Sequence, residues 1–165
     1  MNTFVIEDFD VDEGNVCNIY TVAIEDDISE TEKFYEKYDD PKSEYFDDFG
    51  KIDALLLYIA NEGMRIIRRI RPERAVNAMP PKAIDSEYAI DILGISLRLY
   101  YLQISENVII LFGGGIAHED RTGKIPIQFY DAQKFAKKIL ESIGTEFEVK
   151  GNKLFPTSNN IIRIF

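Results

Sequence analysis

The sequence predicts an α+β fold, in which an antiparallel sheet carries an N-terminal αα-hairpin and a C-terminal amphipathic helix. Short runs of alternating apolar residues, joined by tight turns, are typical of antiparallel strands. Two helical patterns follow one another within residues 29–60, and a third follows the longest strands. Strands that come in runs, instead of alternating singly with helices, favour this class.

The chain has 165 residues, a length that suits one domain with a proper core. We expect a single domain over residues 1–165. It divides into an N-terminal hairpin (1–28), a core (29–143) and a C-terminal hairpin (144–165).

The first hairpin is predicted from strands at residues 4–6 and 16–24, with a turn at residues 12–15 that contains Gly14 and Asn15. A helix then begins at Ser29, because Ser29 and Glu32 have the spacing of a capping box. It ends before Pro41, since the residue that precedes a proline avoids helical geometry. A second helix is predicted over residues 43–60, with Gly63 as its stop.

Residues 65–79 mix isoleucine, arginine and proline, and we expect a short strand followed by a loop. Strands at 95–104 and 108–112 are predicted to form a hairpin that the glycines at 113–115 end. The best helical pattern covers residues 128–143 and is capped by Gly144. Strands at 145–150 and 153–155, and a last one at 161–165, complete the prediction.

Charge is distributed very unevenly. The net charge is −10, which disfavours non-specific nucleic-acid binding, so no DNA partner is expected. Residues 1–60 hold 17 acidic and 4 basic groups, a net of −13, whereas residues 61–165 hold 12 acidic and 15 basic groups, a net of +3. The single cysteine, Cys17, forms no internal disulfide, and no apolar run is long enough for a membrane span. These features predict a cytoplasmic protein with no membrane partner.

One basic cluster is a candidate binding surface: Arg65, Arg68, Arg69 and Arg71. Arginine is the preferred ligand of phosphate and carboxylate groups because its charged fork is planar. Three interpretations stay open: pairing with the acidic first 60 residues, which we favour, a surface for a protein partner, and contact with RNA.

The residues around the only histidine, His118-Glu119-Asp120-Arg121, form a polar loop. His118 titrates in a range that suits acid–base work. A second histidine or cysteine ligand is lacking, so no metal site is predicted. The glycines at 113–115 lack the spacing of a phosphate-binding loop, so no cofactor is predicted.

A segment of the core resembles a known family. Leu97-Arg98-Leu99-Tyr100-Tyr101, then a turn, then the apolar strand that ends in Gly113-Gly114-Gly115, then the helix with Ala132, Phe135 and Ala136, resembles RelE/HigB-type toxins of type II toxin–antitoxin pairs. The resemblance covers about residues 44–143 and implies a RelE-like core. The paired lysines that the family carries after the glycines are replaced here by His118-Glu119-Asp120.

The resemblance implies a cytoplasmic toxin that cleaves mRNA on the ribosome, or an inactive relative, with an antitoxin protein as its partner. Arg98 and Arg121 would stabilise phosphate charge, with His118 as the acid or base. Tyr100, or else Tyr101, would be the aromatic neighbour of Arg98. The alternative from a different class is a non-enzymatic interaction module whose acidic helical hairpin binds a protein of opposite charge. A nucleic-acid mimic is a third interpretation.

Overall fold

The computed structural model describes residues 3–11, 16–117, 124–158 and 160–165. Its centre is one seven-stranded sheet with the strand order β11-β1-β2-β8-β7-β5-β4. These strands are β1 (Phe4–Asp8), β2 (Asn18–Ile24), β4 (Pro72–Glu73), β5 (Val76–Met79), β7 (Leu97–Ser105), β8 (Val108–Ile116) and β11 (Ile162–Ile164). Two small ladders lie outside it: β3 (Ile67–Arg69) with β6 (Ala83–Ile84), and β9 (Phe147–Lys150) with β10 (Lys153–Pro156).

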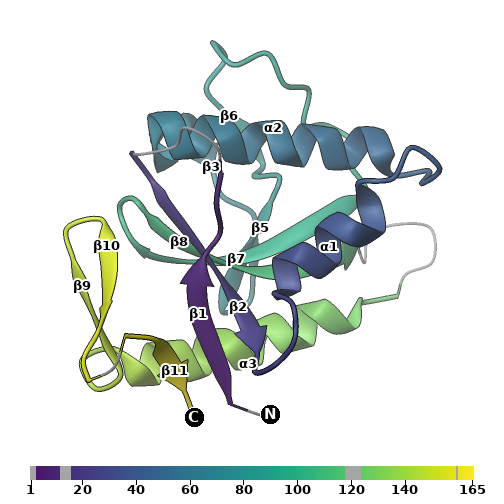
Figure 1. The fold of residues 1–165 in the computed structure, drawn as a ribbon. Helices are drawn as coiled ribbons and strands as arrows, with labels where there is room; N and C mark the ends of the chain where they lie inside the picture. Colours follow the sequence, from purple (N-terminus) through teal and green to yellow (C-terminus); the bar gives the residue numbers. More distant parts are fainter. Residues whose placement is uncertain (1–2, 12–15, 118–123, 159) are drawn as a thin grey trace.

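Helices cover both faces of the sheet (Figure 1). On one face, α1 (Glu30–Tyr38) and α2 (Phe46–Glu62) pack against a core that includes Leu99, Ile109 and Leu111. On the other, α3 (Ile127–Ser142) packs against a second core that includes Phe4 and Phe112. The sheet therefore separates two apolar cores, and its central strands are buried on both sides.

The predicted fold class is wrong in three respects. The sheet is mixed instead of antiparallel, because β2 and β8 pair in parallel. The chain begins with strands β1 and β2, so the helical pair is not its N-terminal element. The helices also lie on both faces of the sheet. The physical reason is β8, which is apolar along its length and is stable only when covered on both faces, as parallel strands usually are.

Most helix and hairpin boundaries are confirmed within a few residues. Ser29 caps α1, with its hydroxyl oxygen accepting a hydrogen bond from the Glu32 N–H at 3.0 Å. Gly63 ends α2 with a φ of 91°, and β9 and β10 pair around Gly151 and Asn152. The predicted turn at residues 12–15 lies outside the described residues.

Two strand predictions are wrong. The glycines at 113–115 do not end β8, which continues to Ile116 through an irregular register opposite β7. Residues 65–79 contain more structure than one short strand and a loop: a 3-10 turn (Met64–Ile66), β3, β4 and β5. β5 is buried and pairs with β7, and its four residues are too few for a periodic signal. Within the described residues, no helix is long and apolar enough to cross a membrane.

Candidate functional site

Arg98, the main predicted catalytic residue, is buried in β7 with 6 % of its surface exposed. Its Nη1 donates hydrogen bonds to the carbonyl oxygens of Ile95 (2.7 Å) and Leu97 (2.9 Å). A buried guanidinium that satisfies backbone carbonyls stabilises the local chain path. The placement of Arg98 therefore indicates a structural role.

Tyr100, predicted to stand beside Arg98, lies on the same side of β7 and is fully buried. Its ring meets Phe129 of α3 edge to face, with ring centroids 5.9 Å apart. His118 and Arg121 lie outside the described residues. Of the four predicted catalytic residues, the structure thus places two, and both lie in the sheet beneath α3.

The predicted basic cluster lies around β3 and β4. Arg65 pairs with Glu62 at 2.8 Å, and Arg68 pairs with Asp85 at 2.6 Å, each through Nη2. These partners lie outside residues 1–60, so the favoured pairing with the acidic first 60 residues is not what these two arginines do. Arg71 donates from Nε to the Pro80 carbonyl oxygen, and Arg69 is exposed on β3.

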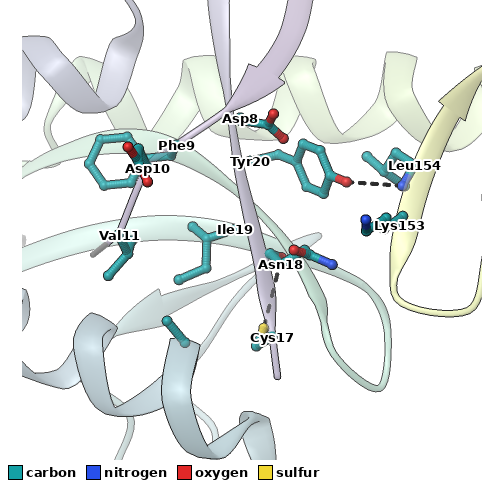
Figure 2. Close-up of a pocket in the computed structure, with 11 residues that line it drawn as sticks. Asp8, Phe9, Asp10, Val11, Cys17, Asn18, Ile19, Tyr20, Lys153 and Leu154 are labelled. Atoms are coloured by element: carbon teal, nitrogen blue, oxygen red, sulfur yellow. Dashed lines mark hydrogen bonds between the residues drawn. The ribbon is translucent and has the colours of Figure 1, made fainter. Parts of the chain in front are cut away.

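A hollow lies where β1 ends and β2 begins. This cavity has a volume of about 610 Å³. Figure 2 shows its lining. We call it the β1 cavity, and it is lined by Asp8, Phe9, Asp10, Val11, Cys17, Asn18, Ile19, Tyr20, Ala60, Lys153 and Leu154.

Two groups of the β1 cavity, the Cys17 thiol and the Tyr20 hydroxyl, are held in their neutral forms. Burial raises the pKa of the Cys17 thiol to about 12, so the thiolate that a cysteine enzyme needs is absent near neutral pH. Burial also raises the pKa of Tyr20, whose hydroxyl oxygen accepts a hydrogen bond from the Leu154 N–H at 3.0 Å. These shifts move both groups away from the range of acid–base catalysis.

A second hollow is also lined by the segment Phe9–Val11 and lies against α2. We call this the α2 groove; its volume is about 350 Å³. It is lined by Phe9, Asp10, Val11, Tyr35, Gly50, Asp53, Ala54 and Leu57. Five of these eight residues have apolar or aromatic side chains, and Leu57 is 42 % exposed. The α2 groove therefore has an apolar floor that water reaches.

The wall of the α2 groove is fixed by aromatic contacts. Tyr35 meets Phe9 edge to face at 5.3 Å and Phe49 at 4.7 Å. The Tyr35 hydroxyl donates a hydrogen bond to Asp53 Oδ1 at 2.6 Å. The groove is consequently formed by three elements whose side chains hold one another in place.

Gly50 opens the helix side of the α2 groove. It is exposed within α2, and a Cβ at this position would meet no atom within 4 Å. Glycine inside a helix costs about 1 kcal/mol relative to alanine. Packing therefore gives no reason for glycine at residue 50. What Gly50 provides is an open stretch of α2 backbone on the helix side of the groove.

Carboxylates surround this region. Asp10 and Asp53 line the α2 groove, and Glu7 of β1 interacts with Glu32 of α1. Burial, and then repulsion from Glu32, raises the pKa of Glu7, which indicates that carboxylates crowd here. The surface is therefore negative as well as apolar.

Among the described residues, no group of three or more His, Cys, Asp or Glu side chains could hold a metal ion.

The comparisons with known proteins give no relative. No family model, no curated protein and no solved structure matches this chain.

The sequence shows that the first 60 residues are acidic, but it does not show the groove that they form. Phe9 and Val11 follow β1 with the alternation of that strand, and Leu57 lies off the apolar stripe of α2. An apolar residue on the outer face of a helix was the available signal. Without the fold, nothing indicated that Leu57 and Phe9 share one surface.

Proposed function

We propose that the protein is a non-enzymatic interaction module, and that the α2 groove binds a basic, amphipathic segment of another protein. The observation that carries the proposal is the exposed apolar floor of the groove inside a negatively charged surface. Apolar residues of the partner would cover Phe9, Val11 and Leu57, and lysine or arginine side chains would meet Asp10 and Asp53.

Charge selects the occupant. Residues 1–60, which supply all eight lining residues, carry a net charge of −13. Such a surface attracts a basic segment and repels an acidic one, so it sets the specificity and speed of association. Desolvation of the apolar floor would supply most of the affinity. An antitoxin, the partner that the toxin resemblance implies, would need to carry such a basic segment.

The mRNA-cleavage prediction has less support from the placement of its residues. Arg98 is buried and donates to two backbone carbonyls, and Tyr100 is fully buried against α3. Both would have to leave the core to touch a phosphate. This prediction is tested separately by measuring growth and translation after tightly induced expression. An arrest of translation would support mRNA cleavage.

The binding proposal is tested with two labelled helical peptides of the same pattern, one of leucine and lysine and one of leucine and glutamate. Fluorescence anisotropy should show binding of the lysine peptide alone. Leu57→Lys should weaken it by about tenfold, because it places a charge on the apolar floor. Leu93→Lys adds the same charge at a residue that is 79 % exposed and does not line the groove, so it should leave the affinity unchanged.

The matched control decides between specific and general attraction. If Leu57→Lys and Leu93→Lys weaken binding equally, the peptide responds only to net charge, and the α2 groove is not the binding site. Equal binding of the glutamate peptide would contradict the proposal as well.

A further inference from the structure

The two edges of the seven-stranded sheet differ in how they are protected. At one edge, β4 has two residues, of which Pro72 has no N–H, and Arg71 and Arg74 flank it. Proline and charge are the usual means of preventing further strand pairing. At the other edge, β11 and its neighbours have the sequence Ile161-Ile162-Arg163-Ile164-Phe165 without proline, and Arg163 is its only charged side chain.

The outward side of β11 carries peptide groups that β1 does not use. The Phe9 N–H donates to the Ile19 carbonyl oxygen, so these two residues form a hydrogen-bonded pair. From this pair, hydrogen-bonded and non-hydrogen-bonded pairs alternate along β1 and β2. The alternation turns the peptide groups of Phe4 and Ile6 towards their partners Ile164 and Ile162 in β11. The N–H and C=O of Arg163 therefore face away from the sheet, where no strand of the described residues pairs with β11.

The exposed side chains of this edge are apolar. Ile162 and Ile164 point into the core beneath α3, whereas Ile161 is 50 % exposed and Phe165 is 71 % exposed. Alternation places Ile161, Arg163 and Phe165 on one side of the strand. An antiparallel copy that pairs Arg163 with its own equivalent would bring Ile161 opposite Phe165 on both sides of the axis.

Charge at the axis is balanced. Arg163 Nε lies 2.6 Å from Glu25 Oε1. Two copies would thus bring two arginines and two glutamates together, a neutral group within a molecule whose net charge is −10. Lys138 Nζ already donates to the Phe165 carbonyl oxygen at 2.9 Å, so the backbone pairing centres on Arg163. The edge is therefore complementary to a second copy of itself in its side-chain pairs, its backbone hydrogen-bonding groups and its charges.

We propose that β11 pairs with β11 of a second copy of this chain, antiparallel and centred on Arg163, which joins two sheets into one continuous sheet. The contact is the same patch on both copies, as in the commonest protein dimers, which have two-fold symmetry. This surface lies beyond β1 at one edge of the sheet and is separate from the lining of the α2 groove. Dimerisation and partner binding are therefore independent.

Sedimentation equilibrium across a concentration series tests the dimer. The wild type should show a monomer–dimer equilibrium. Replacing both Ile161 and Phe165 by lysine should raise the dimer dissociation constant by about tenfold or more, because two cross-strand apolar pairs become charged. Leu93→Lys adds a lysine at a residue that is 79 % exposed and lies outside β11, so it should leave the constant unchanged. A wild type that is monomeric throughout, or a dimer that the double substitution leaves intact, would overturn the proposal.

Cross-linking tests the register. Arg163→Cys places one thiol at the proposed axis, and the buried native Cys17 gives little background. Mild oxidation should link the Arg163→Cys chains into a covalent dimer under native conditions and not in denaturant. Arg65→Cys, at an arginine whose side chain is 60 % exposed, is the matched control. Equal cross-linking of the two variants would reject the proposed register.

Discussion

A Cβ on Gly114 would lie 1.8 Å from the carbonyl oxygen of Arg98. The two residues belong to the central hairpin of β7 and β8, where Arg98 pairs with the neighbouring Gly115. No side-chain adjustment relieves this contact, because the atom that a Cβ would strike belongs to the backbone. The close approach of the strands therefore requires glycine at residue 114.

Gly114→Ala should destabilise the protein by about 3 kcal/mol or more, because the hairpin must open where Arg98 and Gly114 meet. Chemical denaturation monitored by circular dichroism measures the change. A loss below about 1 kcal/mol, the cost of an ordinary substitution, would show that the strands are not held this closely.

Gly50→Ala should do the opposite. Gly50 lies inside α2 with open space at its Cβ position, so alanine should stabilise the protein by about 0.5–1 kcal/mol. The same denaturation experiment measures it. A loss of stability would mean that the backbone at residue 50 is not helical in solution.

The prediction of helices succeeded and the prediction of topology did not, for physical reasons. The helical patterns at residues 43–60 and 128–143 are long and periodic, and α2 and α3 match them closely. The parallel pairing of β2 with β8 joins residues about 90 positions apart, and no local pattern specifies such a pairing. The apolar sequence of β8 predicts that the strand is buried, but it does not predict which strand pairs with it.

The site prediction failed at β7 for a related reason. Residues Leu97–Leu102 are buried on both faces of the sheet, so alternation cannot tell which side a residue faces or whether water reaches it. Arg98 stands out in the sequence as a charge in an apolar strand. A charged residue in an apolar strand is expected for a catalytic arginine and equally for one whose guanidinium donates to backbone carbonyls inside the fold. The structure shows the second arrangement for Arg98.

The substitution Arg98→Met tests whether Arg98 has a structural role or the predicted catalytic role. If Arg98 is structural, its loss leaves the carbonyl groups of Ile95 and Leu97 without their donor and should cost about 2 kcal/mol of stability. Arg65→Met removes an exposed arginine and its ion pair with Glu62, so it should change stability by less than about 1 kcal/mol. If the two variants unfold at the same denaturant concentration, Arg98 does not have the structural role.

Glu7 should make stability depend on pH. Its raised pKa, caused by burial and by Glu32, means that the folded protein holds this proton more tightly than the unfolded chain does. Stability is therefore lost as pH rises from the usual pKa of a glutamate through the raised value in the folded protein. Glu7→Gln removes the charge, so it should raise the thermal midpoint at neutral pH.

The advantage of Glu7→Gln should disappear in acid, below the usual pKa of a glutamate, where Glu7 is protonated in both states. Thermal melts of the variant and the wild type across a pH series measure this. An advantage of constant size at every pH would show that it does not come from the ionisation of Glu7.

The residues that a bound basic peptide contacts show directly whether the α2 groove is its binding site. Backbone amide NMR spectra of the labelled protein, recorded while the leucine–lysine peptide is added, report which residues sense it. We expect the largest shifts at residues that line the α2 groove, such as Phe9, Tyr35, Gly50 and Leu57. Shifts spread over all acidic surfaces, or centred away from the groove, would contradict the assignment of the α2 groove as a protein-binding site.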